Sequence, residues 1–280
     1  MSSPLEAGGA RRDTVAGMAA LRCGDAGAAP VLLVPGYTGS KEDFAPVLDP
    51  IAAAGFRAVA VDLPGQFESA GPDDPGEYAV DRLGQRVLRA AAALGPRVHL
   101  LGHSFGGLVA RAAVIAAAER FASLVLLDSG PSALAGARAE RIRLLAPLLP
   151  HLGVAGVYAA AAAAEAAEPG YVAPGPELAA FYERRFLAGA AAMLAGMSAA
   201  LLSEPDRVGE LAATGVPVLV AFGSADDAWA PEVQRRTASR LGAQAVEIPG
   251  AAHSPAVENP AATAAALIRF FTMLGTLVQG

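Results

Sequence analysis

The sequence predicts an α/β fold in which a mostly parallel sheet carries helices on both faces and a helical insertion interrupts the pattern. Short apolar runs alternate along the chain with longer stretches of helical spacing. Unbroken apolar runs are typical of strands that are buried on both faces, as in parallel sheets. The chain has 280 residues and is 54% hydrophobic and 17% charged, so it can form a sizeable core and is not broadly disordered.

Six apolar runs are predicted to form the strands, because each is followed by a glycine, proline or aspartate that ends it. The predicted strands are residues 31–34, 58–61, 98–101, 124–127, 216–222 and 245–248. The predicted helices are residues 40–55, 77–94, 108–119, 232–241 and 260–274. Strand and helix therefore alternate, which is the pattern of βαβ units and of a parallel sheet.

The alternation fails from about residue 131 to residue 210, where the chain is alanine-rich and helical with no convincing strand. We expect residues 131–210 to form a helical cap over the carboxyl edge of the sheet. Ligands of open α/β sheets bind at that edge. Residues 1–130 and 211–280 would then form the α/β core.

Composition and charge exclude several classes of protein. The chain has 21 basic and 27 acidic residues and a net charge of -6, which argues against a nucleic-acid partner. Its one cysteine, Cys23, cannot form an intramolecular disulfide or a cysteine-rich zinc site, so we expect a small buried side chain there. No metal ligand set is predicted.

Targeting signals and membrane spans are not predicted. The N-terminal residues lack the long apolar segment of a secretory signal, so we expect a cytoplasmic location. Residues 144–164 contain no charged side chain and reach the length of a membrane helix. Pro147, Pro150 and Gly153 break this stretch, so we expect apolar helices that cover a pocket and no stable membrane span.

The segment Gly102-His103-Ser104-Phe105-Gly106 matches the pattern G-x-S-x-G directly after a predicted strand and before a predicted helix. A sharp strand-to-helix turn of this kind exposes the serine oxygen at a helix N-terminus, whose dipole favours an oxyanion. The context predicts Ser104 as a nucleophile. His103 fills the variable position of the turn, where we expect it to shape the pocket.

A serine hydroxyl needs a general base to attack near neutral pH, and four histidines compete for that role. His253 follows the last predicted strand on a loop and comes after the nucleophile and the acid in chain order, so it is the predicted base. His99 lies inside a strand, where we expect it to pack. His151 lies in the insertion and is a candidate substrate contact.

A carboxylate must orient the base. Asp226 and Asp227 follow the predicted strand 216–222, and only one of them can face His253 because neighbouring side chains on a turn diverge. Spacing favours Asp226, with Asp227 and Asp128 as alternatives. Asp62 also ends a strand, but we expect it to stabilise its loop.

Developing negative charge on a carbonyl oxygen requires backbone donors. The N–H of Phe105, directly after the serine, is one predicted donor. The second should come from an early strand-end loop, and Pro35-Gly36-Tyr37 occupies that place. Gly36 allows a close approach of the backbone, so the Tyr37 N–H is the second predicted donor.

Together these residues resemble the α/β-hydrolase superfamily over nearly the whole chain. The motifs that carry the resemblance are Pro35-Gly36-Tyr37, Asp62-Leu63-Pro64-Gly65, Gly102-His103-Ser104-Phe105-Gly106-Gly107, Gly223-Ser224-Ala225-Asp226, and His253 with Glu258 and Pro260. In that superfamily the acid usually stands three residues after a strand-end glycine, which is the place of Asp226. The resemblance implies hydrolysis of an ester or related acyl bond without a metal or organic cofactor.

Two positions depart from the superfamily pattern. Pro35 stands where the first loop usually carries histidine, and Phe67 stands where the loop after Asp62 usually carries a second glycine. Both changes are expected to reshape the pocket and not the triad. Dehalogenases and epoxide hydrolases of the superfamily use an aspartate nucleophile, so Ser104 argues against both activities.

The expected substrate is a small to medium apolar ester. Small residues with Met193, Leu194 and Met197 at helical spacing are available to line an apolar pocket, although ordinary packing of a cap helix produces the same stripe. Trp229 is a further pocket candidate. No cluster of basic residues marks a phosphate or coenzyme A site. The alternatives are thioesterase, lipase, carbon–carbon hydrolase or cofactor-free peroxidase-type activity on the same triad, or a small-ligand receptor with little turnover. An apolar cap surface would also suit a homodimer.

Overall fold

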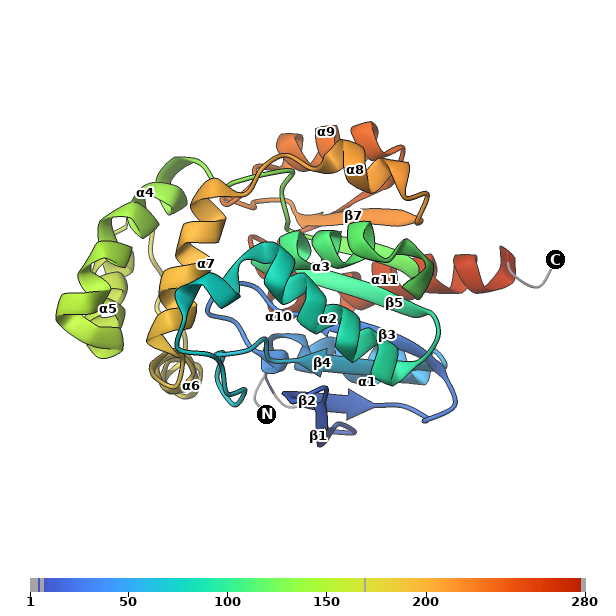
Figure 1. Cartoon of the computed structure of the whole chain (residues 1–280), viewed down its shortest axis with the longest axis horizontal. Helices are drawn as coiled ribbons and strands as arrows, with labels where there is room; N and C mark the ends of the chain where they lie inside the picture. The colour runs from blue at the N-terminus through green and yellow to red at the C-terminus, as the bar shows by residue number, and fades with distance from the viewer. Residues whose placement is uncertain (1–4, 6–7, 169, 278–280) are drawn as a thin grey trace.

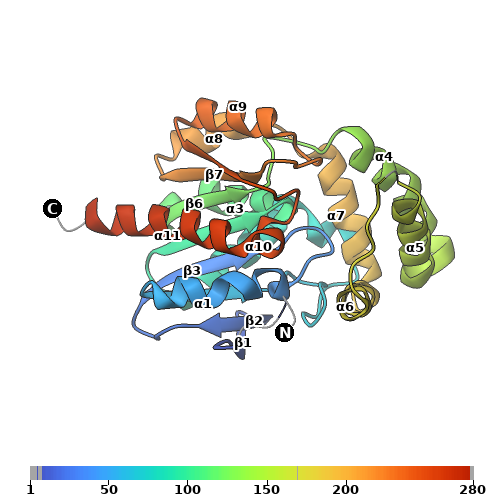
Figure 2. The same ribbon diagram turned by 180° about the vertical axis from the view of Figure 1, so that it is seen from behind.

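The computed structural model describes residues 5, 8–168 and 170–277, and its centre is one eight-stranded sheet (Figures 1 and 2). The strand order is β1-β2-β4-β3-β5-β6-β7-β8. Strands β1 and β2 pair antiparallel with each other, β2 pairs antiparallel with β4, and the other neighbours are parallel. The strands are β1 (Arg11–Val15), β2 (Met18–Cys23), β3 (Ala29–Val34), β4 (Phe56–Val61), β5 (Val98–His103), β6 (Phe121–Leu127), β7 (Val218–Gly223) and β8 (Gln244–Ile248). The predicted fold class is confirmed.

All six predicted strands are present as β3 to β8, whereas the sequence analysis missed β1 and β2 at one edge of the sheet. Strand β1 reads Arg-Arg-Asp-Thr-Val and is mostly exposed, so it has no apolar run to detect. Charged side chains on an edge strand protect it from pairing with other chains. Cys23 is buried at the end of β2, as predicted, with its Sγ 3.1 Å from Asp49 Oδ1.

Helices cover both faces of the sheet, as Figures 1 and 2 show from opposite sides. Helices α2 and α3 pack against each other on one face, while α1 and α11 pack together on the other. Outside the insertion the helices are α1 (Ala45–Ala53), α2 (Val80–Leu94), α3 (Phe105–Ala116), α9 (Pro231–Leu241), α10 (Pro255–Glu258) and α11 (Pro260–Leu277). The short 3-10 helices are η1 (Lys41–Phe44), η2 (Pro75–Tyr78), η3 (Ala118–Arg120) and η4 (Ala146–Leu148).

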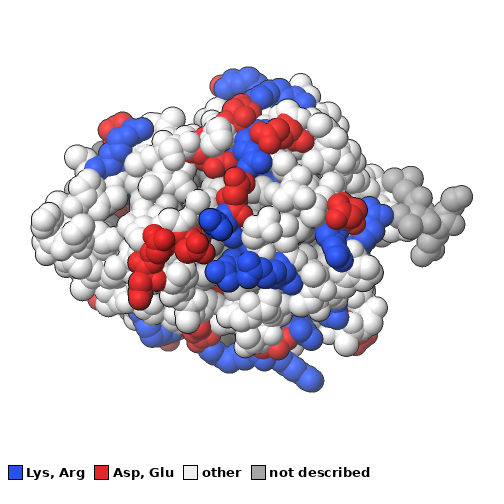
Figure 3. Space-filling model, viewed as in Figure 1, with Lys and Arg blue, Asp and Glu red and all other residues white. Residues whose placement is uncertain are grey.

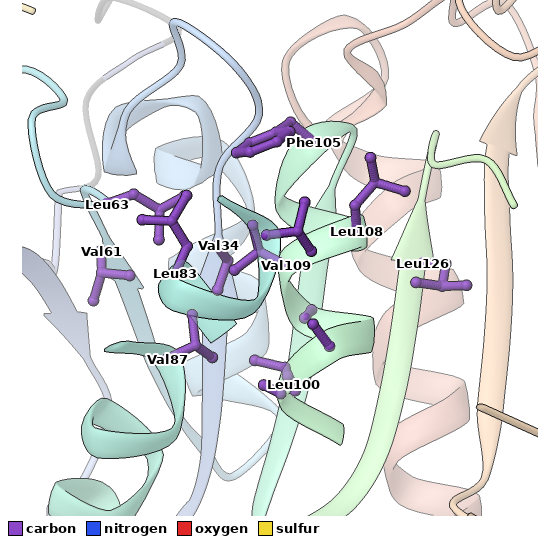
Figure 4. Close-up of a cluster of buried hydrophobic side chains, with 14 of the residues drawn as sticks. Val34, Val61, Leu63, Leu83, Val87, Leu100, Phe105, Leu108, Val109 and Leu126 are labelled. Carbon is purple, nitrogen blue, oxygen red and sulfur yellow. The ribbon is translucent and has the colours of Figure 1, made fainter. Parts of the chain in front are cut away.

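Two apolar clusters, one on each face of the sheet, explain why the central strands are unbroken apolar runs. Successive strand residues point to opposite faces. In β3, Leu32 and Val34 lie in the cluster under α2 and α3, whereas Val31 and Leu33 lie in the cluster under α1 and α11. Figure 4 shows part of the first cluster, where Val34 and strand residue Leu100 meet helix residues such as Val87 and Val109.

The helices between β6 and β7 are α4 (Gly136–Leu145), α5 (Leu149–Ala166), α6 (Pro176–Leu187), α7 (Ala191–Ser203) and α8 (Val208–Ala213). Helices α4 to α6 lie beyond one end of the sheet, with α7 between them and the sheet (Figures 1 and 2). Helix α8 packs instead against α9 and α3. The boundaries of a separate cap at residues 131 and 210 stay a prediction.

By length and composition one helical stretch of the described chain, Gly136–Ala166, could cross a membrane, and 11% of its most apolar window is buried. Gly153 interrupts this stretch with non-helical backbone angles, φ 64° and ψ -178°. Helices α6 and α7 also pass this test as a pair, but they are bent by 94°. On the face drawn in Figure 3, acidic and basic side chains lie interspersed.

Arg111, on α3, holds the two ends of the insertion together. Its guanidinium donates to the Pro131 carbonyl where the chain leaves the sheet, and to Glu204 Oε1 at 2.8 Å and the Pro205 carbonyl at 3.4 Å where it returns. The Arg111 and Glu204 side chains are 1% and 8% exposed. A buried arginine with these partners fixes where the insertion starts and ends relative to α3.

Replacing Arg111 with methionine is expected to lower the free energy of unfolding by about 3–5 kcal/mol, because Glu204 is left buried without its partner. The control is Arg143→Met, which removes an exposed pair with Glu140 and should change stability by about 1 kcal/mol or less. Urea denaturation of both variants measures the difference. Equal effects of the two substitutions would show that the buried pair does not hold the insertion.

Candidate active site

Ser104 lies at a sharp turn between β5 and α3. Its backbone has φ 54° and ψ -123°, a strained conformation for a residue other than glycine. A Cβ on Gly102 would lie 2.2 Å from the Gly106 carbonyl oxygen, and a Cβ on Gly106 would lie 2.3 Å from the Pro35 carbonyl oxygen. The turn therefore requires glycine at both positions, which is the physical basis of the G-x-S-x-G pattern.

The structure brings Ser104, His253 and Asp226 together at the carboxyl ends of β5, β8 and β7. His253 Nε2 lies 2.9 Å from Ser104 Oγ, and His253 Nδ1 lies 2.8 Å from Asp226 Oδ1. A carboxylate only accepts, so Nδ1 carries the proton and Nε2 is free to accept the serine proton. This is the geometry of a nucleophile, a base and an orienting acid.

Asp226 is fully buried as a side chain yet well supplied with donors. Besides His253, the Ala228 N–H donates to Oδ1 at 2.8 Å and Gln234 Nε2 donates to Oδ2 at 2.6 Å. Burial alone would raise the pKa of Asp226, but the hydrogen bond and charge of His253 and the Ala228 N–H bring it below its ordinary value. Asp226 is therefore the ionised carboxylate of the site.

Among the described residues, neither alternative acid is hydrogen-bonded to His253. Asp227 points away from His253 and accepts from Arg138 Nη2 at 2.6 Å and Nε at 2.9 Å. Asp128 is buried and accepts from a backbone N–H at 2.9 Å. Asp128, Asp226 and His253 offer atoms within 4.8 Å of one another, a spacing that a metal site would also show. Within this group Asp226 and His253 are hydrogen-bonded to each other, and Asp128 lies beside them.

The predicted oxyanion loop lies directly against the nucleophile, because a Cβ on Gly36 would be 3.0 Å from Ser104 Cβ. Within the residues that the structure describes, no hydrogen bond is seen from the N–H groups of Tyr37 or Phe105. Two unpaired backbone donors beside a nucleophilic oxygen are what an oxyanion hole requires.

A cavity of about 840 Å³ leads to Ser104 and His253 and separates the insertion from the sheet edge. Apolar side chains from the insertion form much of its wall. They include Leu134, Ile142, Leu145, Leu149, Val157, Leu178, Phe186, Leu194 and Leu201. On the side of the sheet the cavity is lined by the predicted oxyanion loop at Gly36 and Tyr37. This loop contacts the insertion, since the hydroxyl groups of Tyr37 and Ser198 lie 2.8 Å apart.

Residues 31–266 match the model of the "Alpha/beta hydrolase family". The chain belongs to the alpha/beta hydrolase family. The match spans the central strands, the turn at Ser104, the insertion and His253, so it confirms the resemblance carried by the sequence motifs.

Curated relatives of this hydrolase include proteins named for different reactions. The pimeloyl-[acyl-carrier protein] methyl ester esterase of Edwardsiella ictaluri is 31% identical over 258 residues, which is 89% of this chain and 95% of that protein. The 2-hydroxy-6-oxononadienedioate/2-hydroxy-6-oxononatrienedioate hydrolase of Cupriavidus pinatubonensis is 38% identical over 138 residues, or 45% of this chain and 46% of that protein. Several matches, this one among them, span less than half of the relative's length.

Solved structures share the fold of this hydrolase. The enol-lactonase from Burkholderia xenovorans LB400 has a TM-score of 0.78 at 24% identity, covering 94% of this chain and 100% of that one. Similarity at this identity extends to the fold and leaves the substrate open.

The pocket candidates of the sequence analysis have mixed outcomes. His103 and Trp229 line the cavity, but His151 does not, since it is exposed on α5. Met193 and Met197 do not line it either. Both are buried on α7, and Met193 packs close to Gly65. Leu194, the third residue of the predicted stripe, does line the cavity, together with Ser198 and Leu201 of the same helix.

His103 supports the loop that carries the base. Its Nε2 donates to the His253 carbonyl at 2.6 Å. Burial, aided by the nearby charge of His253, lowers the pKa of His103 to about 4, so the ring stays neutral near pH 7. His103 is thus a neutral donor that joins the nucleophile turn to the His253 loop.

Two buried glutamines, Gln66 and Gln234, contact the site and were missed by the sequence analysis, because neither belongs to a pattern. Gln66 is 1% exposed, accepts from the Leu63 N–H at 2.9 Å and donates to the Gly36 carbonyl at 2.7 Å. In a trans peptide the C=O and N–H point in opposite directions. Because Gln66 holds the Gly36 carbonyl, it also sets the direction of the Tyr37 N–H.

Substituting Gln66 with methionine is expected to lower kcat by about 10- to 100-fold with little change in KM, since loss of one oxyanion donor costs about 100- to 1,000-fold. Gln85→Met on the exposed side of α2 is the matched control. Steady-state kinetics on a nitrophenyl ester measures kcat and KM of both variants, and thermal unfolding checks that both are folded. A rise in KM with kcat unchanged would mean that Gln66 does not act on the oxyanion loop.

Proposed function

We propose that this hydrolase cleaves a carboxylic ester of a small to medium apolar substrate through Ser104, His253 and Asp226. The observation that carries the proposal is the continuous hydrogen-bond chain from Ser104 Oγ through His253 to Asp226, at 2.9 and 2.8 Å, beside two unpaired backbone donors. The strained backbone at Ser104 costs folding stability, and strain of this kind clusters at active sites. Its place next to a base supports a catalytic role for Ser104.

The reaction follows from these positions. Ser104 Oγ attacks the ester carbonyl carbon while His253 Nε2 takes the serine proton, and Asp226 stabilises the imidazolium that forms. The Tyr37 and Phe105 N–H groups hold the oxyanion. His253 then gives its proton to the leaving alcohol, and an acyl-enzyme remains on Ser104. A water molecule then attacks the acyl carbon while His253 Nε2 takes its proton. His253 returns that proton to Ser104 Oγ as the acyl–oxygen bond breaks, which releases the acid and restores the free enzyme.

The cavity supports a substrate towards the medium end of the range. Pockets of about 300–1,000 Å³ hold drug-sized ligands, and this one is about 840 Å³ with mostly aliphatic walls in the insertion. Each buried methylene contributes about 0.8 kcal/mol, or about fourfold in kcat/KM if the gain is realised in the transition state. We therefore expect specificity to rise with acyl length until the cavity is filled.

Carbon–carbon hydrolysis is the second candidate, and we consider it for a dienedioate because the Cupriavidus relative is named as a hydrolase of such a compound. A dianionic substrate would need free cationic groups. The cavity wall carries Arg138, Arg141 and Arg185, but each of these is paired with an acidic side chain. This charge balance favours an uncharged ester.

Replacing Ser104 with alanine is expected to lower kcat/KM by at least about 10⁴-fold, since the nucleophile is removed while the fold remains. Ser203→Ala, on the exposed end of α7, should leave activity unchanged. The assay is a nitrophenyl ester series from acetate to decanoate, with circular dichroism to check folding. Turnover retained by the Ser104 variant would contradict the mechanism, and a flat chain-length profile would contradict the use of the cavity.

A further inference from the structure

A second buried carboxyl group lies beside the proposed triad and takes no part in the reaction described above. Asp128 follows β6 and is 0% exposed. Its backbone is left-handed, with φ 46°. Oδ1 accepts from the Gly223 N–H at 2.9 Å, while Oδ2 is buried and finds no donor among the described residues. Such an atom in a native interior calls for an explanation.

The groups around Asp128 supply negative charge. Its carboxylate lies within 4.8 Å of the nearest ligand atoms of Asp226 and His253, and Glu258 on α10 adds a more distant negative charge. Two carboxylates in one buried site cannot both ionise at low cost. Asp226 has three donors, from Ala228, Gln234 and His253, whereas Asp128 has one.

The proton of this pair therefore belongs on Asp128. Burial, with the charge of Asp226 next to it, raises the pKa of Asp128 well above its usual value. A hydrogen bond between the two carboxyl groups favours ionised Asp226 and protonated Asp128. The orphaned Oδ2 then has a partner, because a protonated oxygen can donate.

We propose that Asp128 is a positioning residue that keeps its proton at neutral pH and donates it in a hydrogen bond from Oδ2 to Asp226. Asp226 is then held by four donors, so its Oδ1 stays aimed at His253 Nδ1. The site also keeps a single negative charge next to the base. The role in catalysis rests on the proposed function, but the protonation state does not.

Asparagine at position 128 copies the protonated acid. Its amide can donate to Asp226 while its carbonyl accepts from the Gly223 N–H, and asparagine tolerates the left-handed backbone. Asp128→Asn should keep kcat within about threefold, whereas Asp128→Ala should lower kcat by about 10- to 100-fold with KM unchanged. The reverse order of the two variants would overturn the proposal.

The direct test compares infrared spectra of the unliganded wild type and the Asp128→Asn variant at pH 7. The wild-type minus variant difference should contain the carbonyl stretch of a protonated carboxylic acid. The control is Asp227→Asn, which changes an exposed ion-paired carboxylate and should retain that band. A spectrum that is the same in all three proteins would show that Asp128 is ionised. This measurement needs no substrate, so its failure is distinct from failure of the esterase assay.

The pH dependence gives a second readout. As the pH rises, ionisation of Asp128 should lower both stability and kcat/KM of the wild type, and Asp128→Asn should lack that loss. The melting temperature of Asp128→Asn minus that of the wild type should therefore increase as the pH rises. A constant difference between the two, or activity that requires an added divalent cation at this cluster, would overturn the proposal.

Discussion

The site depends on one backbone constraint, the left-handed turn at Ser104. That turn is held from both sides, since the Ser104 N–H donates to the Leu127 carbonyl at the end of β6 and Gly106 packs against the Pro35 carbonyl after β3. Both contacts exist only because β5 lies between β3 and β6 in a parallel sheet. Parallel strands end at the same edge, so the order of the strands alone brings the nucleophile to the loops that carry its donors.

Three aspartates at this edge show how the surroundings of a carboxyl group decide its state. Asp226 is buried among donors and is ionised, whereas Asp227, one residue away, is exposed and paired with Arg138. Asp128 is buried with a single backbone donor and faces Asp226. All three are aspartates that follow a strand of the sheet. The difference lies in which donors the neighbouring elements supply, and this is a tertiary property.

That distinction explains how far the sequence could predict this molecule. Runs buried on both faces need no tertiary information, so β3 to β7 were predictable. The mostly exposed edge strand β8 was predictable from a short apolar run that ends at Pro249-Gly250, while the charged edge strand β1 had no such signal. The grouping of Ser104 with His253 and Asp226 followed from chain order. The rotation of an alanine-rich helix such as α7 does not follow from its composition. Of the predicted stripe, Leu194 therefore lines the cavity, whereas Met193 and Met197 are buried elsewhere.

The insertion does more than enclose the cavity, because two of its helices contact the oxyanion loop and the turn that follows it. On α7, Ser198 is hydrogen-bonded to the Tyr37 hydroxyl, and on α6, Arg185 donates to Asp43, which in turn accepts from the Ser40 N–H. These contacts join the insertion, which supplies much of the apolar cavity wall, to the loop that carries the Tyr37 N–H. If that N–H holds the oxyanion as proposed, the position of α6 and α7 and the position of the donor are set by the same hydrogen bonds.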